Sequence, residues 1–253
     1  MENLLKTGRI FYGFGIAGLG IQQFIYAGFR PVFLPPWPLW LQSSTVLAYL
    51  AGLALLAAGI FIMLGKKTGP ISLWLGGFFL FLFLAFHTPY LLFVNPNSPR
   101  HLGIWTNPLK EVALAGGAWV IAGSDPLHSD TKWRRIGTIF FSIMLIAFGI
   151  DHFFYAGFVA TLVPSWIPGS FFWTYFAGVA LIGSGAALIL GIGSRQVALL
   201  LGIMLFLWVV MLHIPRAVAN PSGDEGNEVT SVWEALAFCG VAFVLYRQPA
   251  KIH

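Results

Sequence analysis

Charged residues and cysteines are scarce in this chain of 253 residues. Asp, Glu, Lys and Arg together make up only 9% of it, whereas hydrophobic residues make up 58%. Soluble domains carry about 25% charged residues, so this composition excludes a water-soluble fold and predicts an integral membrane protein. The lipid bilayer is therefore an expected partner of the chain. Cys239 is the single cysteine. An intramolecular disulfide and the Cys-x-x-Cys chemistry of thiol oxidoreductases are therefore excluded.

The net charge of +5 does not indicate nucleic-acid binding. The basic residues form short clusters between apolar runs, which is the placement typical of membrane topology signals. No nucleic-acid partner is expected.

Eight apolar runs approach the length of about 20 residues that a helix needs to cross a bilayer. The sequence therefore predicts an all-α membrane protein with about eight transmembrane helices. The runs cover residues 8–29, 44–64, 71–93, 106–122, 133–158, 171–191, 196–218 and 230–246.

The second half of the chain repeats the first in the same order. The matched segments are Tyr26-Ala27-Gly28-Phe29 with Tyr155-Ala156-Gly157-Phe158, Tyr49-Leu50-Ala51-Gly52 with Tyr175-Phe176-Ala177-Gly178, His87-Thr88-Pro89 with His213-Ile214-Pro215, and Glu111 with Glu234. Ordered matches of His, Pro and Glu indicate an internal duplication rather than shared membrane composition. The prediction is two four-helix repeats, at residues 1–123 and 133–248.

Four helices per repeat is an even number, so both repeats enter the membrane from the same side and are parallel. Most basic residues then fall on one side of the membrane, which places both termini in the cytoplasm by the positive-inside rule. That side carries Lys6, Arg9, Lys66, Lys67, Lys132, Arg134, Arg135, Arg195, Arg247 and Lys251, and the other side carries Arg30, Arg100, Lys110 and Arg216.

Ionisable residues inside membrane helices are costly and mark candidate sites. The second repeat has five: Asp151, His152, His213, Arg216 and Glu234. Counted from the outer helix ends at about 1.5 Å per residue, they share one layer roughly 6–10 Å below the outer surface. Tyr155 stacks over Asp151. The first repeat has Gln22, Gln23, His87, Lys110 and Glu111 at the matching places, and glutamine does not titrate, so the second repeat is the better candidate for activity.

Several chemistries fit this layer. Two histidines and a carboxylate are typical ligands of a transition metal, and histidines also ligate haem iron. The same residues hydrogen-bond a quinone head group or relay protons. A purely structural network, with Glu234 paired to Arg216 and Asp151 to a histidine, is the remaining alternative.

The runs Gly149-Ile150-Asp151-His152-Phe153, Val163-Pro164-Ser165-Trp166-Ile167-Pro168-Gly169 and Leu212-His213-Ile214-Pro215-Arg216 resemble the DoxX-like membrane family. The likeness extends over both halves, although members of the family usually have one four-helix unit. The resemblance implies a four-helix bundle in a bacterial inner membrane. It also implies a relation to subunits of a thiosulfate:quinone oxidoreductase, and so to other membrane or periplasmic redox subunits as partners.

The leading hypothesis is a redox-associated membrane subunit that binds quinone in the outer leaflet. His213, His152 and Glu234 are its candidate catalytic residues, and Asp151, Arg216, His87, Glu111 and Tyr155 are its candidate cofactor-binding residues. If the chain is an enzyme, it is a quinone-linked oxidoreductase subunit. The alternatives are an assembly subunit without catalysis, a metal- or haem-binding membrane protein, and a small-solute transporter.

Overall fold

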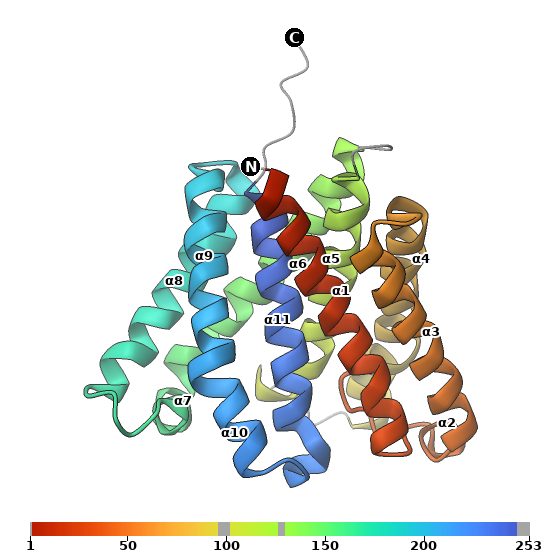
Figure 1. The fold of residues 1–253 in the computed structure, drawn as a ribbon. Helices are drawn as coiled ribbons and strands as arrows, with labels where there is room; N and C mark the ends of the chain where they lie inside the picture. Colours follow the sequence, from red (N-terminus) through yellow and green to blue (C-terminus); the bar gives the residue numbers. More distant parts are fainter. Residues whose placement is uncertain (1, 96–101, 126–129, 247–253) are drawn as a thin grey trace.

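The structure, a computed structural model, describes residues 2–95, 102–125 and 130–246 (Figure 1). All regular secondary structure in these residues is helical. Within these described ranges, six helices are long and apolar enough to cross a membrane: Thr45–Leu64, Thr68–Val94, Thr131–Phe154, Ser170–Leu190, Ser194–Ala219 and Asn227–Leu245. The prediction of a helical protein with several membrane-spanning helices is confirmed. Two of the eight predicted spans are not among these six helices.

The two long helices outside the set are α1 (Glu2–Ile25) and α5 (Thr106–Gly123). Both are rich in small residues, and α5 carries Lys110 and Glu111 near its start. Every residue of α5 from Glu111 to its end is buried. Since these helices face protein more than lipid, they need less apolar surface than their neighbours do.

Helices α1, α5, α6 (Thr131–Phe154) and α11 (Asn227–Leu245) form the centre of the bundle. Helices α3 (Thr45–Leu64) and α4 (Thr68–Leu82) lie on one side of this centre, and α8 (Ser170–Leu190) and α9 (Ser194–Trp208) lie on the other (Figure 1). The connections α3–α4 and α8–α9, the start of α1 and the end of α11 are all at the same end of the bundle.

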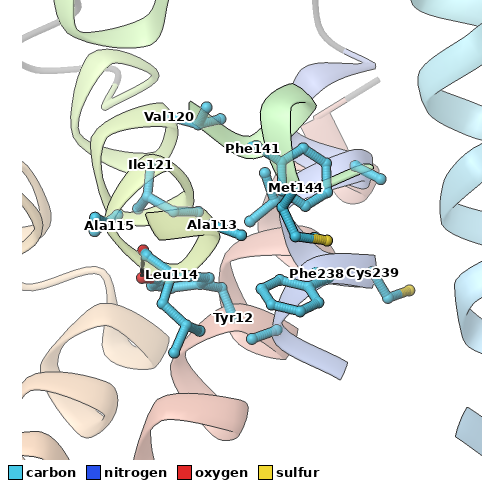
Figure 2. Close-up of a cluster of buried hydrophobic side chains, with 14 of the residues drawn as sticks. Tyr12, Ala113, Leu114, Ala115, Val120, Ile121, Phe141, Met144, Phe238 and Cys239 are labelled. Atoms are coloured by element: carbon cyan, nitrogen blue, oxygen red, sulfur yellow. Dashed lines mark hydrogen bonds between the residues drawn. The ribbon is translucent and has the colours of Figure 1, made fainter. Parts of the chain in front are cut away.

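Glycines allow the central helices to approach closely. A Cβ built on Gly137 of α6 lies 2.4 Å from the backbone oxygen of Gly116 on α5, and one on Gly240 of α11 lies 2.4 Å from the oxygen of Gly8 on α1. Only backbones without side chains come this near. The buried cluster beside these contacts includes Tyr12, whose hydroxyl donates to the Leu114 carbonyl at 2.7 Å (Figure 2).

Both long spans that contain a His-x-Pro sequence change helical pitch at the histidine. The π-helical turns η1 (Phe83–His87) and η2 (Tyr90–Val94) continue α4, and η5 (Val209–His213) followed by α10 (Ile214–Ala219) continues α9. Proline lacks the amide hydrogen that an α-helix needs, and a π turn accommodates the loss. Pro89 and Pro215 thus follow the π turns η1 and η5, and Pro215 itself lies in the α-helix α10.

The fifth predicted run, 133–158, is not one helix. Helix α6 ends at Phe154 and a separate helix, α7 (Ala156–Leu162), follows after Tyr155, whose backbone lies outside helical geometry. The other short elements are α2 (Leu39–Gln42) and the 3₁₀ turns Leu102–Trp105 and Gly223–Gly226. Trp40 in α2 and Trp166 after α7 are exposed, as side chains at a lipid–water boundary are expected to be.

Candidate functional site

A cavity of about 620 Å³ lies among α6, α7, α8, α9, η5 and α11. Most of the side chains that line it are aliphatic, aromatic or methionine. The polar or ionisable members of the lining are Lys110, His152, Thr174, Ser231, His213 and Glu234. An apolar chamber with a few polar groups is the usual form of a site for a small organic ligand.

His213, at the end of η5, lines the cavity. No described residue hydrogen-bonds its imidazole ring. The following turn carries Arg216, which forms an ion pair with Glu228 at the start of α11. His213 is thus held by a helix that is itself fixed to α11, and its ring nitrogens remain available to a ligand.

His152, near the end of α6, enters the same cavity from another helix. Its Nδ1 lies 2.7 Å from the carbonyl oxygen of Phe148, one turn earlier in the helix. The ring also stacks against Trp208 of α9, with centroids 6.3 Å apart and planes 18° apart. Two contacts therefore fix its orientation.

Glu234 of α11 is paired with Lys110, whose Nζ lies 2.8 Å from its Oε2. Both side chains are nearly buried, with exposed fractions of 11% for Lys110 and 2% for Glu234. The lysine comes from α5, so the first half of the chain supplies one group to a cavity that the second half otherwise builds. The sequence predicts Glu234 at this site but does not assign Lys110 to it, because nothing local indicates that α5 and α11 are neighbours.

The structure brings together three of the predicted residues, His152, His213 and Glu234. Arg216, Asp151 and Tyr155 are not among the described residues that line the cavity. The pairing of Glu234 with Arg216, which belonged to the structural alternative, is wrong, since each of the two has a different partner. The Tyr155 hydroxyl accepts a hydrogen bond from the Gly103 amide at 3.3 Å, so this residue attaches the end of α6 to the segment before α5.

His87 and Glu111, which the sequence matches to His213 and Glu234, lie on the other side of the bundle. His87 Nε2 is 3.6 Å from Glu111 Oε2 and donates to the Val32 carbonyl at 3.1 Å. Both side chains are buried, Glu111 completely. Val32 and Phe33 are also buried, and Phe33 stacks on Phe79 of α4 with planes 5° apart. Here the chain itself fills the space beside the histidine.

Arg30 holds in place the segment that contains Val32 and Phe33. It is 5% exposed, its guanidinium donates to the Glu225 carbonyl, and its amide donates to Gln23 Oε1 at 3.2 Å. Burial lowers the pKa of the guanidinium, and the nearby Glu225 carboxylate opposes that shift. The basic side chain that the sequence places on the outer face is thus an internal anchor between the two halves.

No group of three or more His, Cys, Asp or Glu side chains among the residues described lies close enough to hold a metal ion.

Residues 141–244 match the model of a family described as a domain of unknown function (DUF8561). The match covers less than half of the chain. It contains His152, His213 and Glu234 and leaves out Lys110. No curated protein and no solved structure matches the chain.

Proposed function

We propose that the chain is a redox-associated membrane subunit that binds a quinone in the cavity beside His152, His213 and Glu234. One observation carries the proposal: these three ionisable side chains, from three separate helices, line one largely apolar chamber together with Lys110. Ionisable groups at membrane depth need a functional or structural reason, and a chamber that they share supplies one.

The lining fits the chemistry of a prenylated quinone. Such a ligand combines a flat ring, two oxygen atoms that accept hydrogen bonds, and a long apolar tail. The chamber volume lies within the range of about 300–1,000 Å³ found for small-molecule sites. Trp173, Phe176 and Leu207 belong to the lining and are exposed. They give the tail an apolar path from the head group to the surrounding lipid.

The chain's own residues would bind and orient the head group. His213 has ring nitrogens available to donate a hydrogen bond to a ligand oxygen. The first half of the chain supports this role, because its matching histidine, His87, already donates to a carbonyl oxygen, that of Val32. The bound group itself supplies the redox chemistry, and electrons would come from partner subunits of the membrane or periplasm.

We also propose that the chain spans a bacterial inner membrane eight times as two parallel four-helix repeats, with α1 and α5 added to the six apolar helices. The matching π turns before Pro89 and Pro215 and the matching glutamates support a duplication. The common end of the α3–α4 and α8–α9 connections carries Lys66, Lys67 and Arg195. This charge supports a cytoplasmic location for that end. Arg100, Arg247 and Lys251 lie outside the described residues, and the resemblance to the DoxX-like family remains a prediction.

The proposal is tested by binding. The chain is purified in lipid nanodiscs and titrated with a decyl-substituted benzoquinone. Replacing His213 by alanine removes one hydrogen-bond donor, so we expect affinity to fall about tenfold. Val218→Ala, at an exposed position outside the cavity lining, is the control and should bind like the wild type. A chain that binds no quinone would remove the proposal and leave a subunit that acts through assembly.

A further inference from the structure

The two histidines of the cavity offer opposite hydrogen-bonding groups. A carbonyl oxygen only accepts hydrogen bonds, so the 2.7 Å contact to the Phe148 carbonyl requires that Nδ1 of His152 carry the hydrogen. In a neutral imidazole the other nitrogen, Nε2, then has a lone pair and no hydrogen. The free ring nitrogen of His152, a residue that lines the cavity, is therefore a hydrogen-bond acceptor, whereas His213 has no described partner and is able to donate.

The charges around the cavity favour this neutral form. Among the described residues that line the cavity, Lys110 and Glu234 are the only ones, apart from the histidines, that carry a full charge, and they pair with each other at 2.8 Å. The Glu234 carboxylate is thus already compensated by a cation. The lining that the described residues form holds no second carboxylate to stabilise a proton on His152 Nε2. The stacking partner Trp208 is uncharged.

A quinone has two carbonyl oxygens, and both are acceptors. One accepts from His213, but the other, where it lies beside His152, meets a lone pair instead of a donor, and a buried acceptor left without a donor costs free energy. A quinol has two hydroxyl groups, each both donor and acceptor. One hydroxyl donates to His152 and the other accepts from His213, so both contacts are satisfied.

We propose, on the basis of the quinone-binding function above, that the cavity binds the reduced, quinol form in preference to the quinone, and that His152 determines this preference. His152 is in this view a specificity-determining residue, and His213 holds both redox forms.

The experiment compares the two redox forms on the full chain in lipid nanodiscs. A decyl-substituted benzoquinone and its benzoquinol are titrated separately under anaerobic conditions by calorimetry. For the wild type, the quinol should bind about tenfold more tightly, which corresponds to one unsatisfied buried acceptor. His152→Phe keeps a flat ring against Trp208 and removes the lone pair. In this variant the two affinities should become equal, through weaker binding of the quinol.

Two further variants separate the possible results. His152→Gln offers either an acceptor oxygen or a donor NH2 group, so the preference should disappear through stronger binding of the quinone, and His213→Ala should weaken both forms alike. A wild type that binds both forms equally, or the quinone more tightly, overturns the inference and leaves the proposed function in place. An unchanged preference in His152→Phe also overturns it. A wild type that binds neither form removes the proposed function as well.

Discussion

At the scale of single residues, the Lys110–Glu234 ion pair brings two charges together where both are nearly buried. Two nearly buried charges attract strongly where little water screens them, but each alone would be costly to bury. The described contacts give Glu234 Oε2 one cationic partner, the Lys110 ammonium, at 2.8 Å. The pair is therefore expected to be sensitive to the loss of either partner and tolerant of the loss of both.

Replacing Lys110 by methionine leaves the Glu234 carboxylate without its cation. We expect the free energy of unfolding to fall by about 3–5 kcal/mol, the usual cost of breaking a buried pair from one side. An unfolding titration in mixed detergent micelles measures this change in the free energy of unfolding. Lys132→Met, at an exposed position, is the control. The double variant Lys110→Met/Glu234→Gln should recover much of the lost stability. If its loss equals the sum of the losses of the two single variants, the pairing is contradicted.

At the scale of helices, close packing of small residues joins the two halves. Helix α5 meets α6 at Gly116 and Gly137, and α1 meets α11 at Gly8 and Gly240. These contacts leave no room for a methyl group between backbones, which do not move aside as a flexible side chain does. The position of α5, and with it the position of Lys110 in the cavity, depends on such contacts.

Adding one methyl group at this junction should separate the helices. In Gly137→Ala the new Cβ would lie 2.4 Å from the Gly116 oxygen, so we expect a loss of about 1–3 kcal/mol from overpacking. The thermal midpoint of unfolding in detergent measures the effect. Gly183→Ala on α8 meets no atom within 4 Å and should be neutral or slightly stabilising. Equal effects at the two positions would show that close approach does not matter here.

At the scale of the whole molecule, the sequence predicts the elements better than the relations between them. Composition and apolar runs predict the helices because lipid imposes both length and hydrophobicity on each one separately. The shared depth of His152, His213 and Glu234 follows from counting residues along those helices. The helix to which Lys110 belongs is also predictable, but its neighbour is not, since packing of α5 on α11 depends on the small residues of both. For the same reason the partners of Arg216 and Arg30 do not follow from sequence.

The two halves differ in what lies beside the matched histidines. Val32 and Phe33 fill the space beside His87, and the histidine hydrogen-bonds within the protein, to the Val32 carbonyl. Beside His213 there is a cavity. The same residue type in the same sequence context therefore has a structural role in one half and is available for binding in the other.

This difference predicts opposite effects for the same substitution. His87→Ala leaves the Val32 carbonyl without its donor and removes the imidazole beside the buried Glu111, so we expect a loss of about 1–3 kcal/mol of stability. His213→Ala breaks no described hydrogen bond and should change stability little, while it weakens quinone binding about tenfold. Thermal unfolding and quinone titration on both variants, in the same lipid, measure the two effects together. If His213→Ala proves the more destabilising variant and His87→Ala the one that loses affinity, the assignment of the binding site to the second half is wrong.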